Sequence, residues 1–104
     1  MFAGGSYEEV ARWFRIFLNS HAKRENPRIE ALVEAGGART GRTFGVRLRL
    51  DEAYTPALDQ PLIEFSFQDV SAGKGSFSWC DSVATRVRGW AREILSAERL
   101  RKSA

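Results

Sequence analysis

The stretch FGVRLRLD (residues 44–51) alternates apolar and polar side chains, and this period of two decides the fold class. Successive side chains of a β-strand point to opposite faces of the sheet, so strict alternation indicates a strand with one buried and one exposed face. We therefore expect this strand to cover a hydrophobic core on one side. Its core side carries Phe44, Val46, Leu48 and Leu50, and its outer side carries Gly45, Arg47, Arg49 and Asp51.

Two further segments are predicted to pair with this strand. Residues 28–35 show the same alternation, and the glycine-rich GGARTGR (36–42) that follows them is typical of a hairpin loop. After the central strand, residues 51–61 contain two prolines and are predicted to form a loop. A third strand is predicted from Leu62 to Gln68. Together the three strands predict a small antiparallel sheet with one apolar face.

An amphipathic helix is predicted on each side of these strands. Ser6 and Glu9 have the spacing of a capping box, and large apolar residues then recur at helical spacing as far as about Lys23. A second apolar stripe begins shortly after residue 78, and its helix is predicted to end near Glu98. Because each stripe must be buried against another element, both helices are expected to pack on the sheet.

The order α-β-β-β-α predicts an α+β fold, a two-layer sandwich in which both helices cover one face of an antiparallel sheet. A short fourth strand at GSFSW (75–79), around Phe77, is a variant of this prediction. The whole chain, 1–104, is expected to form a single domain. Its ends, residues 1–5 and 99–104, are expected to be flexible.

The composition fits a globular protein with a hydrophobic core, because 43% of the 104 residues are hydrophobic. No apolar run approaches the ~20 residues of a membrane span, and no signal peptide is expected. With one cysteine, Cys80, no internal disulfide is expected, which favours a reducing, cytoplasmic location. The net charge of +3 is the small difference between 16 basic and 13 acidic side chains, so clusters matter more than the total.

Neighbouring glutamates are predicted to neutralise the two arginines on the outer face of the central strand. Pairing of the first two strands places Glu30 opposite Arg47 or Arg49, and pairing with the third strand places Glu64 opposite one of them. Opposite charges across strands stabilise a sheet face. This face is therefore interpreted as structural, with a nucleic-acid backbone as the alternative ligand.

Other basic residues fall outside this pairing and are candidates for binding an anion or a nucleic-acid backbone. Arg39 and Arg42 lie in the predicted hairpin loop. Arg88, Arg92 and Arg99 lie within a narrow sector of the second helix, away from its apolar stripe. Such a stripe is usually a solvated helix face, and phosphate binding is the alternative.

The stretch DVSAGKGSFSW (69–79) joins a predicted strand to a predicted helix through two glycines, as phosphate-binding loops do. It matches neither G-x-x-x-x-G-K-[ST] nor G-x-G-x-x-G. Gly73 and Gly75 are therefore interpreted as a flexible connection. The alternative is a generic anion site in which Lys74 and the start of the helix hold negative charge.

No catalytic residue, metal site or cofactor is predicted. Cys80, at the start of the second helix, would need a base to act as a nucleophile. His21 is the one histidine, and near the end of the first helix it is expected to face solvent. Cys80 borders the apolar stripe and is interpreted as a small buried thiol. One cysteine and one histidine do not make a zinc site.

The order α-β-β-β-α resembles the layout of the double-stranded-RNA-binding domain. That family contacts RNA through its first helix, the loop between its first two strands and a lysine cluster that opens its second helix. Here the first helix carries outward Arg12 and Arg15, but GGARTGR lacks the Pro-His of the family and SFSWCDS (76–82) lacks lysines. The resemblance therefore covers topology and no motif, and it does not place the chain in that family.

The sequence favours a small non-catalytic binding or protein-interaction domain, without identifying the ligand. Leu32 and Leu62 interrupt the polar face of the sheet and are candidates for a homodimer interface. The expected partners are a second copy of the chain, another protein or a small molecule, and no membrane. The alternative function is weak binding of a nucleic-acid backbone through the loop and helix arginines.

Overall fold

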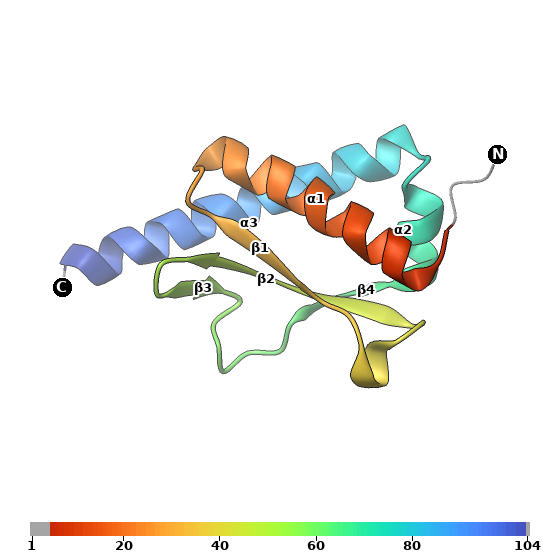
Figure 1. Ribbon diagram of the computed structural model, residues 1–104. Helices are drawn as coiled ribbons and strands as arrows, with labels where there is room; N and C mark the ends of the chain where they lie inside the picture. The colour runs from red at the N-terminus through yellow and green to blue at the C-terminus, as the bar shows by residue number, and fades with distance from the viewer. Residues whose placement is uncertain (1–4, 104) are drawn as a thin grey trace.

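A four-stranded antiparallel sheet forms one layer of the protein, of which the computed structural model describes residues 5–103 (Figure 1). The strands are β1 (Glu30–Glu34), β2 (Thr43–Leu50), β3 (Ala53–Thr55) and β4 (Ile63–Ser66). β2 is central: β1 pairs with one of its edges, and β3 and β4 pair end to end with the other. The predicted hairpin of the first two strands is confirmed, and its loop contains the short 3-10 helix Gly37–Arg39.

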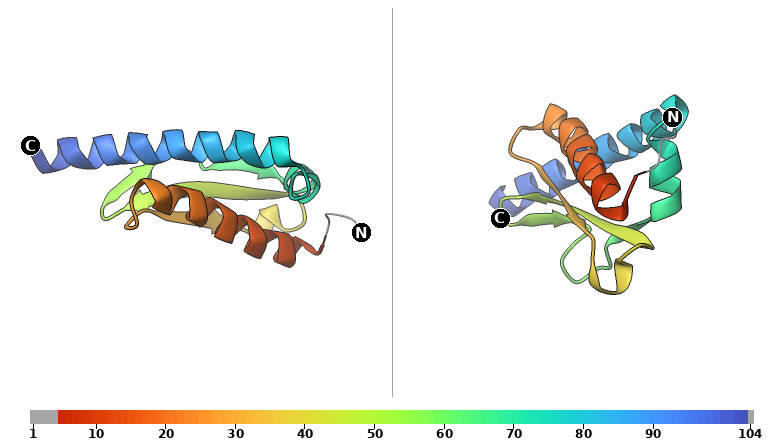
Figure 2. Two further views of the ribbon diagram at one scale, coloured as in Figure 1. Left: turned by 90° about the horizontal axis from the view of Figure 1, so that it is seen from above. Right: turned by 45° about the vertical axis from the view of Figure 1, so that its right-hand side comes forward.

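Three helices form the second layer. They are α1 (Tyr7–Glu25), α2 (Phe67–Gly73) and α3 (Phe77–Ser103). Figures 1 and 2 show α1 and α3 side by side on the same face of the sheet, with α2 at the end of the layer near the start of α1. α1 packs against β1, and α3 packs against β2 and β3. The predicted α+β sandwich, with both amphipathic helices on one face of an antiparallel sheet, is confirmed.

α1 has the boundaries that local residues dictate. The Ser6 Oγ accepts a hydrogen bond from the Glu9 N–H at 3.1 Å, and the Glu9 Oε1 accepts one from the Ser6 N–H at 2.9 Å. These two bonds complete the predicted capping box. The helix ends at Glu25, because Asn26 is held extended ahead of Pro27.

One edge of β2 carries an interrupted strand. β3 lies opposite residues 48–50, and β4 lies opposite residues 43–46. Residues 56–62 leave the sheet between these two strands. The segment contains two prolines, which have no N–H to donate to a neighbouring strand, so it cannot continue the ladder.

Two predicted boundaries on this edge are wrong. The predicted loop over residues 51–61 contains β3, and the predicted strand over 62–68 ends at Ser66. There the Ser66 Oγ accepts a hydrogen bond from the Asp69 N–H at 3.0 Å, and this cap begins α2. The Ser-x-x-Asp spacing was the sequence indication of this helix.

The predicted fourth strand around Phe77 is also wrong, because Phe77 is the first residue of α3. The Ser76 Oγ accepts a hydrogen bond from the Trp79 N–H at 3.2 Å, in the manner of an N-cap. The helix therefore begins at Phe77, close to residue 78, where the second apolar stripe was predicted to begin.

α3 continues through the predicted flexible tail to Ser103. Two ion pairs link successive turns at its end. Lys102 and Arg101 lie 3.0 Å and 3.8 Å from Glu98, at helical spacings of four and three residues. Such pairs favour the helical conformation over a frayed one. The predicted flexible segment over residues 1–5 lies, except for its last residue, outside the described residues.

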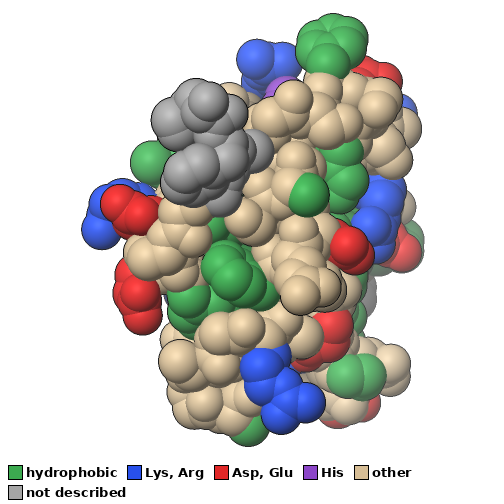
Figure 3. Space-filling view, turned by 90° about the vertical axis from the view of Figure 1, so that its right-hand side faces the viewer, with side chains coloured by type: hydrophobic (Ala, Val, Ile, Leu, Met, Phe, Trp, Pro, Cys, Tyr) green, Lys and Arg blue, Asp and Glu red, His purple; other side chains and the backbone are tan. Residues whose placement is uncertain are grey.

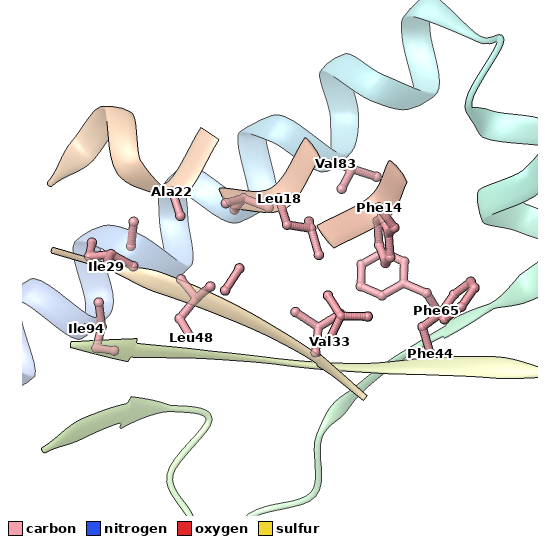
Figure 4. Packing of buried hydrophobic residues seen from close by; sticks show 14 of the residues in the cluster. Phe14, Leu18, Ala22, Ile29, Val33, Phe44, Leu48, Phe65, Val83 and Ile94 are labelled. Carbon is pink, nitrogen blue, oxygen red and sulfur yellow. The ribbon is translucent and has the colours of Figure 1, made fainter. Parts of the chain in front are cut away.

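The alternating residues of β2 form the floor of the core, as predicted. Phe44, Val46 and Leu48 are fully buried, and Leu50 is nearly so. Figure 4 shows helix side chains meeting the sheet side chains across the space between the layers. The labelled helix residues are Phe14, Leu18, Ala22, Val83 and Ile94, and those of the sheet layer are Ile29, Val33, Phe44, Leu48 and Phe65.

The outer edge of β1 is closed by side chains of α1. The Asn19 Oδ1 accepts a hydrogen bond from the Ala31 N–H at 2.9 Å, and the Asn19 Nδ2 donates to the Ala31 C=O at 3.1 Å. The Arg15 guanidinium donates to the Val33 C=O at 3.3 Å. An open strand edge can pair with another chain, so these bonds withdraw part of the edge from such pairing.

Gly73, at the end of α2, lets an indole ring of α3 come close. A Cβ at this position would lie 2.1 Å from the Cδ2 atom of Trp79. Trp79 in turn packs against Trp13 and Phe14, with ring centres 6.4 Å and 6.2 Å away. Gly73 is therefore needed for the packing of α2 against α3. This packing accounts for the glycine without a phosphate-binding role.

Substituting Gly73 with alanine is expected to destabilise the protein by roughly 1–3 kcal/mol, because Trp79 must leave its packed position. The matched control is Gly89→Ala in the middle of α3, where nothing lies within 4 Å of the added Cβ. That substitution is expected to stabilise by about 0.5–1 kcal/mol, the usual helical gain of Ala over Gly. Urea unfolding followed by circular dichroism measures both, and effects of the same sign would contradict the packing role.

Substituting Asn19 with alanine is expected to lower the free energy of unfolding by about 1–3 kcal/mol, because the backbone groups of Ala31 lose their partners. Ser20→Ala, at the exposed neighbouring position, is expected to change it by less than about 0.5 kcal/mol. The same urea titration measures both variants. If the two are equally stable, the edge of β1 does not depend on the Asn19 side chain.

Candidate functional site

The two arginines on the outer face of β2 have different partners. Arg49 lies opposite Glu30 and forms an ion pair with it at 3.3 Å, so this predicted pair is confirmed. Arg47 instead donates to the backbone C=O of Gln60 at 2.5 Å. The segment that leaves the sheet between β3 and β4 folds over Arg47 and supplies this carbonyl, so Arg47 has an uncharged partner.

Glu64 lies opposite Gly45, so the prediction that it faces an arginine of β2 is wrong. The interruption of the third strand sets a different register. Glu64 pairs with Arg39 of the β1–β2 loop at 2.5 Å, and Glu34 lies 3.9 Å from the same guanidinium. The hydrogen bond between Arg39 and Glu64 raises the pKa of the first and lowers the pKa of the second. Arg39 is therefore not the unpaired cation that was predicted.

Arg42, the other candidate in the loop, is exposed. Its side chain makes no hydrogen bond or ion pair with the residues that the structure describes. It shares a hollow of about 420 Å³ with Arg39 and Glu64. Glu64 lines the same hollow and is paired with Arg39. Of the two arginines predicted to bind an anion at this loop, only Arg42 therefore has no partner among the described residues.

Lys74 lies in the turn between α2 and α3. Its Nζ is 5.9 Å from the centre of the Trp13 ring, a distance at which a cation is attracted by the aromatic face. The anion site predicted at this turn thus has its lysine directed toward an indole of α1.

The three arginines predicted as a stripe on α3 differ in their surroundings. Arg88 donates to the Thr85 Oγ1 at 3.3 Å, and Arg92 pairs with Glu25 of α1 at 3.4 Å. Arg99 is exposed and makes no ion pair with a described residue. Figure 1 shows the β1–β2 loop below the sheet and α3 above it. The predicted loop and helix arginines therefore do not form one binding surface.

A shallow groove of about 240 Å³ lies between α1 and α3, where the two helices run side by side (Figure 2). Two arginines line it, Arg24 from α1 and Arg88 from α3. Neither has a carboxylate partner among the described residues. We refer to this feature as the α1–α3 groove, and its lining residues are His21, Arg24, Phe77, Cys80, Asp81, Ala84 and Arg88.

Phe77 stands at this groove with 91% of its surface exposed, more than any other large apolar residue in the described part of the chain. It is the first residue of α3 and precedes Val83, the first buried residue of the helix. Figure 3 shows this end of the molecule, where a hydrophobic side chain projects at the top with basic, acidic and histidine side chains around it. An aromatic ring in this position is a typical anchor for a binding partner.

His21 is half-buried in the wall of the groove, so the expectation that it faces solvent is wrong. Its ring packs edge-on against Phe17, with ring centres 4.7 Å apart. Burial and the nearby charges of Arg24 and Arg88 lower the pKa of His21 below its ordinary value of 6.5. His21 is therefore neutral at pH 7 and contributes a ring, without charge, to the groove.

Cys80 lines the same groove as His21, a proximity that the sequence did not predict. Its Sγ lies 3.5 Å from the C=O of Gly73, to which the thiol donates. Burial raises the pKa of the Cys80 thiol, because a thiolate is less favourable away from water. Cys80 is therefore a half-buried, protonated thiol at neutral pH.

Leu32 and Leu62, the predicted dimer interface, are half-buried on the outer face of the sheet. Leu32 lies opposite Arg47 in the β1–β2 register. Leu62 covers Gly45, where a Cβ would lie 2.6 Å from the Leu62 Cδ1. Leu62 thus packs on its own sheet, and dimerisation through this face stays a prediction.

Comparison of the chain with protein-family models, with curated proteins and with solved structures yields no match. Over residues 5–103, no three Cys, His, Asp or Glu side chains gather as a metal site. None of the helices in this range has a stretch with the length and hydrophobicity needed to cross a bilayer. The α1–α3 groove is therefore interpreted from its own geometry.

Iodoacetamide is expected to alkylate Cys80 several-fold more slowly in the folded protein at pH 8 than in the urea-unfolded chain. The raised pKa leaves less thiolate, and half-burial limits access. Mass spectrometry of the intact protein over time measures both rates. A folded protein that reacts as fast as the unfolded chain would indicate an activated thiol and support an enzymatic interpretation.

Proposed function

We propose that this protein is a small non-catalytic interaction domain whose α1–α3 groove binds an acidic segment of another protein. The observation that carries the proposal is the placement of the exposed Phe77 ring at a groove that also carries Arg24 and Arg88. An aromatic ring supplies apolar contact area, and arginines supply charge and directional hydrogen bonds. These residue types are enriched among those that dominate binding energy at protein interfaces.

The charges of the groove favour an acidic ligand because they do not cancel. Neither Arg24 nor Arg88 has an ion pair with a described residue, and the Arg88 guanidinium donates a hydrogen bond to the Thr85 hydroxyl. Asp81 is the single carboxylate among the lining residues. Since His21 is neutral at pH 7, the groove carries a net positive charge. A partner with carboxylates facing the two arginines would be electrostatically complementary.

The walls of the groove favour a protein segment over a nucleic-acid backbone. Phosphate binding depends on several unpaired cations along one surface, whereas Arg39 and Arg92 are already paired with glutamates. Cys80, Ala84 and the ring of Phe77 form apolar walls between the charges. Such walls suit leucine or aromatic side chains of a peptide, with the arginines placed to receive its acidic residues.

Binding of single-stranded nucleic acid is the second candidate function. The observation that favours it is Arg99, which continues the α3 stripe beyond Arg88 and is exposed without an ion pair among the described residues. In that case Phe77 would stack against a base, and the arginines would contact phosphates. The affinity would then fall steeply with salt, because each phosphate contact releases counterions.

Catalysis is not part of the proposal because the groove offers no activated group. Burial holds the pKa of Cys80 above its ordinary value, and the pKa of His21 is lowered. The proposal includes a cytoplasmic location, because a reducing compartment keeps an unpaired cysteine as a thiol. A second copy of the chain, meeting Leu32 and Leu62, is a further candidate partner that light scattering would detect.

A display library of random short peptides is expected to yield binders rich in Asp, Glu and large apolar residues. Phe77→Ser is expected to weaken these binders by about tenfold or more, as loss of an anchoring aromatic ring does at protein interfaces. Arg24→Glu combined with Arg88→Glu is expected to abolish binding, because it replaces attraction by repulsion. Fluorescence polarisation of a labelled, selected peptide measures these affinities.

Matched controls separate the groove from the rest of the surface. Leu58→Ser removes another exposed apolar side chain, and Arg12→Glu with Arg42→Glu reverses two exposed arginines elsewhere. Both controls are expected to keep the affinity, and Phe77→Ser is expected to keep its stability within about 0.5 kcal/mol. Selected peptides without acidic enrichment, or peptides indifferent to Phe77→Ser, would overturn the proposal. Binding of a labelled single-stranded RNA in place of peptides would favour the second candidate.

A further inference from the structure

A second hollow lies at the interrupted edge of the sheet, away from the α1–α3 groove. Because residues 56–62 leave the sheet between β3 and β4, one flank of α3 is not covered there by a strand. The hollow has a volume of about 330 Å³, at the lower end of the range for small-molecule sites. We refer to it as the Trp90 pocket, lined by Thr55, Pro56, Ala57, Gln60, Ile63, Trp90 and Glu93.

The apolar part of the Trp90 pocket is held in place by aromatic contacts. The Trp90 ring packs edge-on against Phe65, with ring centres 6.3 Å apart. The Arg86 guanidinium lies 5.1 Å from the centre of the Trp90 ring and 5.0 Å from that of Phe65. These contacts restrict the indole, so that it offers a preformed surface to a ligand. The remaining apolar walls are Pro56, Ala57 and Ile63.

The polar part of the pocket carries negative charge. Glu93 is exposed, and its carboxylate has no hydrogen bond or ion pair with a described residue. Arg86 comes one helical turn before Trp90, and Glu93 comes about one turn after it. Of these two charged residues, Arg86 lies over the Trp90 ring and only Glu93 lines the pocket.

We propose that the Trp90 pocket binds a small organic cation, an ammonium group carried on an apolar body. The ammonium would lie against the Glu93 carboxylate, because Arg86 already lies over the Trp90 ring. The body would fill the space against Pro56 and Ile63. A neutral apolar ligand would leave the carboxylate without a partner, and an anion would be repelled by it. The site is independent of the α1–α3 groove and of the function proposed for it.

The probe that tests this site is phenethylammonium chloride, titrated into the 104-residue chain. Nuclear magnetic resonance of the tryptophan side-chain N–H groups follows binding. The signal of Trp90 is expected to shift in a saturable manner, while those of Trp13 and Trp79 stay in place. Phenylethyl alcohol has a similar shape without the charge, and it is expected to bind about two- to fivefold more weakly, within the range that one exposed charge pair contributes.

A matched pair of variants identifies the group responsible. Glu93→Gln is expected to remove the preference for the ammonium over the alcohol, and its exposed position leaves folding unaffected. Glu8→Gln removes an exposed carboxylate of α1 and is expected to leave the preference unchanged. Equal binding of the two probes, a preference that survives Glu93→Gln, or the absence of a saturable shift would each overturn the proposal.

Discussion

Burial of one face of β2 is the constraint on which the rest of the structure depends. Its apolar residues each contribute roughly 1.5–3 kcal/mol when fully removed from water, and they lie on a single side of the strand. Both long helices must therefore stack on that side, and the outer face of the sheet is left to charged residues such as Glu30 and Arg49. Two helices on one face also leave their own outer surfaces uncovered. The α1–α3 groove is a consequence of this arrangement.

The two edges of the sheet are completed in different ways, and the difference determines where ligands can enter. At the β1 edge, Asn19 takes the place of a strand at one position by satisfying both backbone groups of Ala31. At the other edge, the chain departs between β3 and β4 and returns seven residues later. The Trp90 pocket lies at this departure, where Pro56, Ala57 and Ile63 line it together with Trp90.

Patterns among neighbouring residues predicted the architecture. Contacts that depend on the length of a loop could not be predicted from the sequence. The period of two in β2 and the capping box at Ser6 depend only on neighbouring residues, so the sheet and α1 could be predicted. The pairing of Glu30 with Arg49 followed from side-chain parity within a hairpin. Glu64 could not be placed in this way, because its register depends on how many residues leave the edge. The placement of His21 and Cys80 in one groove depends on the packing of two helices, and no pattern of neighbouring residues indicates it.

α3 contributes residues to both proposed sites, because the two flanks of the helix lie beyond the stripe that packs on the sheet. Its apolar stripe faces β2 and β3, and each flank of that stripe borders a different neighbour. On the flank toward α1, Arg88 and Phe77 meet the end of a helix that carries Arg24, and the surface there is basic. On the flank toward β4, Trp90 and Glu93 meet the gap in the third strand, and Glu93 is the charged residue that lines the pocket there. The core separates the two flanks, so a ligand at one site leaves the other open.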